Sequence, residues 1–73
     1  MTMIKKFNCE IDCAACAEKV TDAIRKIDGV EDVSVNFLTQ KFKLKAVDAR
    51  FDEILEEAIA TGKRIEPDFS VER

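Results

Sequence analysis

Two short runs of alternating residues near the middle of the chain constrain its fold more than any other feature. In the first, Val33, Val35 and Phe37 alternate with polar residues, and in the second, residues 41–46, apolar residues alternate with lysines. Such period-two alternation is typical of a strand with one buried and one solvated face. Because only residues 38–40 separate the two runs, we expect an antiparallel hairpin.

The segment before the hairpin predicts a strand followed by a helix. Residues 4–9 read as a strand that places Phe7, Cys9 and Ile11 on one side. Residues 14–27 carry apolar side chains at helical spacing, with charged residues on the opposite face. We expect this helix to end before Gly29, which readily adopts the left-handed conformation that closes helices.

The segment after the hairpin predicts a second helix and a last strand. Asp48 is the expected N-cap of this helix, and Gly62 is expected to end it after Thr61. Its apolar stripe consists of Phe51, Ile54, Leu55 and Ala58. The last strand is expected at residues 64–69, where Pro67 is compatible only with the edge of a sheet.

The predicted order of elements is therefore β-α-β-β-α-β, in a chain of 73 residues. That length leaves room for a single domain, residues 1–73, with a thin core. The order predicts an α+β, ferredoxin-like sandwich, in which a four-stranded antiparallel sheet is covered on one face by two helices.

Composition excludes several classes of function. The net charge is −3, basic residues form no block, and Trp and Tyr are absent, so nucleic-acid binding has no support. No apolar run approaches the ~20 residues that span a bilayer, and the first residues lack the apolar core of a signal peptide. We expect a cytoplasmic monomer whose three cysteines stay reduced and serve as ligands or core residues.

One cluster carries the chemistry, the segment Asp12-Cys13-Ala14-Ala15-Cys16 at the junction of the first strand and the first helix. Two cysteines at this spacing can direct both sulfurs at one point. The helix N-terminus favours negative charge there, so both thiols should ionise readily. Thiolates are soft ligands that suit Zn²⁺, Cu⁺ and similar ions.

A CxxC pair also occurs in structural zinc sites and in redox proteins, and other features of this sequence argue against both. A closed structural zinc site needs four protein ligands, and the chain has three cysteines and no histidine. A thioredoxin-like redox pair remains an alternative. The motif contains neither Trp nor Pro, and the middle of the chain has no proline to shield a dithiol.

Three stretches together resemble the heavy-metal-associated domain: residues 11–20 around the two cysteines, Ile27-Asp28-Gly29-Val30, and residues 33–37. The resemblance covers nearly the whole chain and implies the same βαββαβ fold. It also implies a metal-binding module rather than an enzyme, either a metallochaperone or an N-terminal domain of a P1B-type ATPase. Its partner would then be the transport site of such an ATPase or a sister metal-binding domain.

Asp12 bears on the choice of metal. Asp before the first cysteine resembles the domains of zinc, cadmium and lead exporters, whereas copper domains commonly have Thr there. Zn²⁺ and Cd²⁺ take more ligands than Cu⁺, and a carboxylate can supply one. We therefore expect Zn²⁺ or Cd²⁺ on Cys13, Cys16 and Asp12, with Cu⁺ as the alternative. Asp12 is also compatible with a helix N-cap that binds no metal.

Three positions depart from the family pattern. Glu10-Ile11 stands where many members have Gly-Met, although Ile11 can still anchor the loop from below. Lys63 resembles a lysine of some eukaryotic copper chaperones that offsets the thiolate charge, but it is equally compatible with a plain surface lysine. Cys9 lies on the strand in phase with Phe7, so we expect it in the core rather than as a third thiolate ligand.

Overall fold

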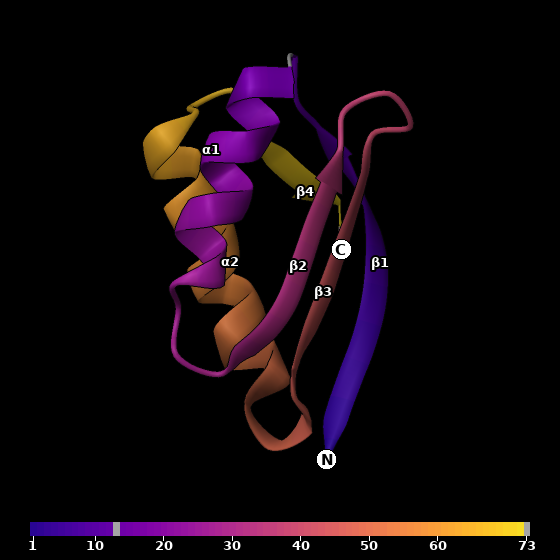
Figure 1. Ribbon diagram of the computed structural model, residues 1–73, viewed down its shortest axis with the longest axis vertical. Helices are drawn as coiled ribbons and strands as arrows, with labels where there is room; N and C mark the ends of the chain where they lie inside the picture. Colours follow the sequence, from indigo (N-terminus) through magenta and orange to yellow (C-terminus); the bar gives the residue numbers. More distant parts are fainter. Residues whose placement is uncertain (13, 73) are drawn as a thin grey trace.

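The chain folds in the predicted order of elements, with one additional 3-10 turn. The computed structural model describes residues 1–12 and 14–72. Figure 1 shows strands and helices in two layers. The bounds are β1 Thr2–Glu10, α1 Ala14–Arg25, β2 Val30–Asn36, β3 Lys41–Val47, the 3-10 turn η1 Asp48–Arg50, α2 Phe51–Ile65 and β4 Ser70–Glu72.

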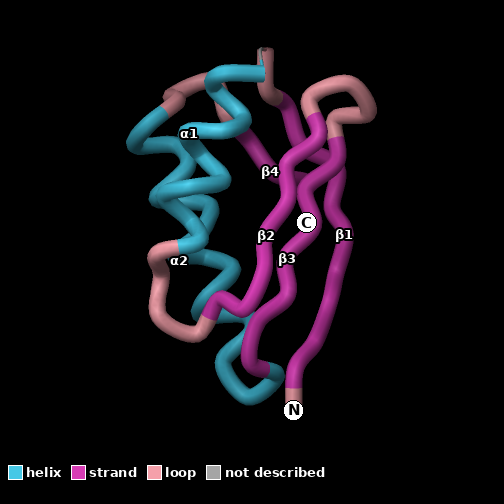
Figure 2. The backbone as a smooth tube through the Cα atoms, viewed as in Figure 1, coloured by secondary structure: helices cyan, strands magenta, loops and turns pink. Residues whose placement is uncertain are grey.

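The four strands form one antiparallel sheet in the order β2-β3-β1-β4. Both helices cover the same face of this sheet (Figure 2). Phe42 on β3 pairs with Phe7 on β1 and with Val35 on β2. Since β1 and β2 are both antiparallel to β3, they are parallel to each other, and α1 provides the crossover between them. The predicted ferredoxin-like α+β sandwich and the predicted hairpin are both confirmed.

The core lies between the helices and the inward face of the sheet. Phe42, Leu44 and Ala46 on β3 are completely buried. The ring of Phe42 lies 6.1 Å, centroid to centroid, from the ring of Phe7 and also from that of Phe69. Burying each large side chain of this kind stabilises the fold by about 1.5–3 kcal/mol. The helices contribute Ala17, Val20 and Ile24 from α1 and Phe51, Ile54, Leu55, Ala58 and Ile59 from α2.

The predicted end of the first helix was wrong: α1 ends at Arg25, and Gly29 lies in the turn that follows, where the Val30 N–H donates to the Ile27 carbonyl over 3.2 Å. The Ile27 N–H donates to the Ile24 carbonyl over 3.0 Å, a tight last turn common at helix ends. Gly29 has φ +99°, which non-glycine residues rarely adopt. A Cβ there would also lie 2.6 Å from Cδ1 of Ile54. The backbone conformation therefore favours glycine, and any larger residue would also displace the end of the Ile54 side chain.

The predicted start of the second helix was wrong. Asp48 does not cap α2; it opens the 3-10 turn, and α2 begins at Phe51 without a side-chain cap. The Phe51 N–H instead donates to the Asp48 carbonyl. The Asp48 N–H is bound to the carbonyl of Met1, which ties this segment to the start of β1. The N-cap position of α2 is Arg50, two residues after the predicted cap.

The predicted end of the second helix, and with it the predicted last strand, was also wrong. α2 continues through Gly62 to Ile65, so residues 64–69 cannot form the strand. Pro67 lies in the turn before β4, and the Phe69 N–H closes that turn by donating to the Glu66 carbonyl over 2.9 Å. β4 does lie at the sheet edge, as expected. Within the described residues, neither helix combines the length and the apolar character that crossing a membrane requires.

Gly62 has a packing role in place of a terminating one. It is buried inside α2, and a Cβ at this position would lie 2.6 Å from two carbon atoms of the Phe69 ring and 3.2 Å from Cγ1 of Val20. Glycine therefore allows the Phe69 ring to contact the backbone of α2. This contact fixes the chain just before β4 against the helices.

We expect Gly62→Ala to lower the free energy of unfolding by about 1–3 kcal/mol, the usual cost of overpacking. Helix propensity alone would make the alanine variant about 1 kcal/mol more stable. A loss of stability in Gly62→Ala would therefore come from packing, and a gain would come from helix propensity. Urea unfolding checks the prediction. Ala60→Gly, at an exposed position of α2, calibrates the propensity contribution. A more stable Gly62→Ala variant would contradict the close contact.

Candidate metal site

Asp12 and Cys16, two of the three predicted ligands, lie at the end of the molecule where β1 leads into α1. β1 ends at Glu10, and α1 begins at Ala14. The β2–β3 turn and the connection between α2 and β4 lie toward the same end (Figure 1). Of the three predicted ligands, Asp12 and Cys16 belong to the described part of the chain, and Cys13 lies outside it.

Ile11 is the fixed point immediately before the candidate ligands. Its side chain is buried with 4% exposure, which confirms its expected role as an apolar anchor. Its backbone is held as well: the Ile11 N–H donates to Oε1 of Gln40 over 3.0 Å, and Nε2 of Gln40 donates to the Ile11 carbonyl over 2.8 Å. The backbone preceding Asp12 is therefore tied to the β2–β3 turn.

Asp12 is exposed one residue further on, so its carboxylate is accessible to solvent. A carboxylate in this position is available to an incoming cation without first breaking a buried contact. Ligation and helix capping both remain predictions for Asp12.

Cys16 lies in the first turn of α1 and is half-buried, in contact with the edge of the core. Its neighbours Ala14 and Ala15 are exposed, so the approach to this turn is sterically open, as expected. The first turn of α1 carries no acidic residue. The positive end of the helix dipole is therefore available to stabilise a thiolate at Cys16.

Cys9 belongs to the core, as predicted. It is 4% exposed and pairs across the sheet with Val71. Burial raises the pKa of the Cys9 thiol above its ordinary value of 9.0, and the nearby charge of Lys41 opposes this shift only in part. A buried thiol that keeps its proton is a poor metal ligand, because the thiolate is the ligating form.

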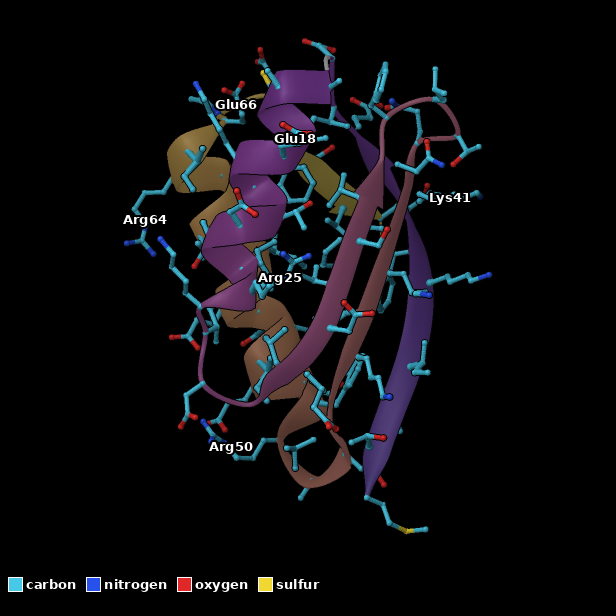
Figure 3. The ribbon with its side chains drawn as sticks, viewed as in Figure 1. Glu18, Arg25, Lys41, Arg50, Arg64 and Glu66 are labelled. Atoms are coloured by element: carbon cyan, nitrogen blue, oxygen red, sulfur yellow. The ribbon has the colours of Figure 1, made fainter. Side chains whose placement is uncertain are left out.

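Charged residues of both signs lie toward the end that holds the candidate ligands. Glu18 on α1 and Glu66 after α2 lie toward this end (Figure 3). Lys63 is exposed in the last turn of α2, and its contribution to the site remains a prediction. Acidic side chains near a site raise the local concentration of cations.

Joint ligation of a metal by Asp12, Cys13 and Cys16 remains a prediction. Among residues 1–12 and 14–72, no three His, Cys, Asp or Glu side chains form a metal-binding group. Asp12 and Cys16 belong to these residues, and Cys13 does not. A surface groove of about 660 Å³ between α1 and β2 is lined by Glu18, Asp22 and Arg25 among others and by neither Cys9 nor Cys16. The described part of this groove's lining therefore contains neither Asp12 nor Cys16.

Sequence reasoning missed Gln40. Residues 38–40 were expected only to turn the chain, yet the side chain of Gln40 holds the backbone of Ile11, 29 positions away. Its φ is +56°, a conformation for which turns usually use Gly or Asn, so the residue type gave no sign of it. A single sequence gives no indication of the long-range contact itself.

Comparison with known proteins places the chain in a metal-handling context. A family model described as the heavy-metal-associated domain matches residues 7–64. The zinc/cadmium/lead-transporting P-type ATPase of Escherichia coli (strain K12) is 50% identical over 36 residues. That match covers 49% of this chain but 5% of the ATPase, so the chain spans a small fraction of the length of this relative.

Solved structures share the fold along almost the whole chain. The CopZ metallochaperone superposes with a TM-score of 0.77 at 20% identity, covering 96% of this chain and 100% of CopZ. The N-terminal domain of a potential copper-translocating P-type ATPase from Bacillus subtilis, in the Cu(I)-loaded state, gives a TM-score of 0.79 at 21% identity. It covers 99% of this chain and 86% of that one. At these identities the likeness shows a common fold.

We expect Cys9→Ala to lower stability by about 1 kcal/mol through a small cavity, and to leave Cd²⁺ binding unchanged. Because the pKa of Cys9 is raised in the fold, the stability of the protein depends on pH. Above pH 9 the thiol ionises in the unfolded chain but keeps its proton in the fold, so stability falls as pH rises through this range. The Cys9→Ala variant should therefore lose less stability than the wild type between pH 7 and pH 10.

Urea unfolding at both pH values, together with thiolate-to-Cd²⁺ charge-transfer absorption, checks this prediction. Loss of one sulfur ligand's absorption in Cys9→Ala would mean that Cys9 binds the metal.

Proposed function

The chain belongs to the heavy-metal-associated domain family, and on this premise we propose that it carries Zn²⁺ or Cd²⁺ on Cys13, Cys16 and Asp12. Domains of this family bind heavy metals and are not catalytic in themselves, so the bound ion is cargo. The main support is the position of Cys16 in the first turn of α1, four residues after the exposed Asp12. Cys9, the other described thiol, is buried in the core.

The chemistry of the donors favours a soft divalent ion. Two thiolates bind Zn²⁺, Cd²⁺ or Cu⁺, but Zn²⁺ and Cd²⁺ gain from a third, oxygen donor. Asp12 is the acidic residue closest in sequence to the two cysteines and is exposed. Three protein ligands leave a coordination position open on an ion that prefers four.

An open coordination position would allow the metal ion to be transferred to a partner protein. An incoming thiolate or carboxylate of a partner can join the ion before a ligand of this chain leaves, so the ion is never released to water. The exposed Ala14 and Ala15 offer little steric resistance on that side. We propose that the partner is the transport site or a sister domain of a P1B-type ATPase, in the cytoplasm, and that the chain acts as a monomer. The zinc/cadmium/lead-transporting relative supports this choice.

A Cu⁺ carrier is the second candidate, and Lys63 favours it. Lys63 is exposed in the last turn of α2, which points to the end of the molecule where α1 begins (Figure 1). A cation near a two-thiolate Cu⁺ site would offset its net negative charge. Asp12 distinguishes the two candidates, because a linear Cu⁺ site does not need a carboxylate.

We expect Cys13→Ser and Cys16→Ser each to abolish tight binding of Zn²⁺, Cd²⁺ and Cu⁺ while the fold is retained, because hydroxyls are poor ligands for soft ions. Competitive titration of the reduced protein measures binding, and circular dichroism measures folding. Stoichiometric binding retained in the double variant would exclude this site.

Substitution of Asp12 should identify the metal. Asp12→Ala is expected to weaken Zn²⁺ much more than Cu⁺, since zinc loses one of three protein donors. It would also cost about 1 kcal/mol of stability if Asp12 caps the helix. Asp12→Asn separates these effects, because Asn caps about as well but is an uncharged and poorer donor.

Apo melting and both affinities are measured for the wild type and the two variants. Asn should restore apo stability without restoring zinc affinity. Equal zinc affinity in wild type and Asp12→Asn would show that Asp12 is no ligand, and would place Cu⁺ first.

A further inference from the structure

Gln40 connects the β2–β3 turn to the backbone that leads into the candidate site. Its backbone carbonyl accepts the N–H of Cys9 over 2.9 Å. Its side-chain oxygen accepts the N–H of Ile11 over 3.0 Å. Its side-chain nitrogen donates to the carbonyls of Ile11, over 2.8 Å, and Phe37, over 2.6 Å. One residue therefore binds both the end of β1 and the start of its own turn.

These bonds extend the sheet beyond its last pair of residues. The pairing of β1 with β3 ends at Asn8 and Lys41. The Cys9 N–H then binds the backbone of Gln40, and the amide side chain continues the ladder to both polar groups of Ile11. The side chain of Gln40 takes the place of a strand neighbour where no strand remains.

The backbone of Gln40 is held in an uncommon conformation. It is the one non-glycine residue in the described part of the chain with a positive φ, +56°. Asn36 supports the turn from its other side, since its Oδ1 accepts the N–H groups of Leu38 and Thr39 over 2.9 and 3.3 Å. Conformations of this kind persist where the surroundings determine them strongly, and they are concentrated at functional sites.

We propose that Gln40 is a positioning residue for the metal-binding loop. By holding Ile11 through two side-chain hydrogen bonds, it fixes the backbone one residue before Asp12 and so limits the positions open to that carboxylate. A loop ordered in advance loses less conformational freedom when it binds. Groups that orient metal ligands without touching the metal typically contribute ~10-fold or more to affinity. This inference rests on the proposed function and adds a residue to it.

Gln40→Met tests the proposal, because methionine has a similar length but neither an amide donor nor a carbonyl acceptor. We expect ~10-fold weaker binding of Cd²⁺ and faster hydrogen exchange of the Ile11 amide in the apo protein. The charge-transfer absorption at saturation should be unchanged, because the same thiolates bind the ion. Gln40→Gly serves as a second variant: it adopts a positive φ without strain, removes the same side chain and should lose affinity similarly.

Asn36→Ala is the matched control. It weakens the same turn but removes no contact with Ile11, so its affinity for Cd²⁺ should stay within about two-fold of wild type even where its urea midpoint falls. Unchanged affinity in Gln40→Met and Gln40→Gly, with faster exchange of the Ile11 amide, would overturn the positioning role. An equal loss in Asn36→Ala would assign the effect to turn stability and overturn it too.

Failure of the proposed function gives a different result. A double variant, Cys13→Ser and Cys16→Ser, that binds Cd²⁺ as tightly as the wild type would overturn the site itself, and the role of Gln40 with it. The Ile11 amide would still be protected in the wild type. The hydrogen-bond contact and the metal-binding role are thus measured separately.

Discussion

The inward face of β3 is the surface on which the rest of the structure depends. Phe42, Leu44 and Ala46 alternate along this central strand and are completely buried. β1 and β2 pair on either side of β3, and both helices lie above the sheet (Figure 2). The contacts of Phe42 with Phe7 and Phe69 connect segments from the start, middle and end of the chain. A small domain has little other apolar surface to bury, so this strand sets the position of everything else.

The fold places the two described cysteines in different environments. Cys9 lies on the inward face of β1 and is buried with the core, where its proton is retained. Beyond Glu10 the chain leaves the sheet, and Cys16 follows in the first turn of α1, half-buried at the end of the molecule. Position relative to the sheet, rather than residue type, determines which thiol is suited to ligation.

Periodicity predicted those features that depend on local pattern. The alternation around Val35 and Phe42 predicted the hairpin, and Gly29 was recognised as a position with a left-handed backbone, although α1 ends at Arg25. The errors occurred where a distant segment decides the outcome. Gly62 was taken for a helix terminator, but the ring of Phe69 requires a glycine inside the helix. Asp48 was taken for a cap, although its N–H is bound to Met1.

The candidate site also combines features that local sequence predicts with one that depends on a distant contact. The CxxC spacing, the preceding Asp12 and the anchoring Ile11 can be read from neighbouring residues. The contact between Gln40 and Ile11 cannot, because nothing in a local pattern reports which side chain meets a backbone on another strand. Its detection required the three-dimensional arrangement of β1 and the β2–β3 turn.

The contact between Ile11 and Gln40 also has a consequence for biosynthesis. The two residues are 29 positions apart, so the chain must close a long loop before they meet. The hairpin forms from local contacts, whereas β1 has no partner strand until β3 has been synthesised. A nascent chain therefore exposes the thiols of its CxxC pair well before the backbone beside them is ordered. During that interval the thiols are exposed to solvent and open to oxidants.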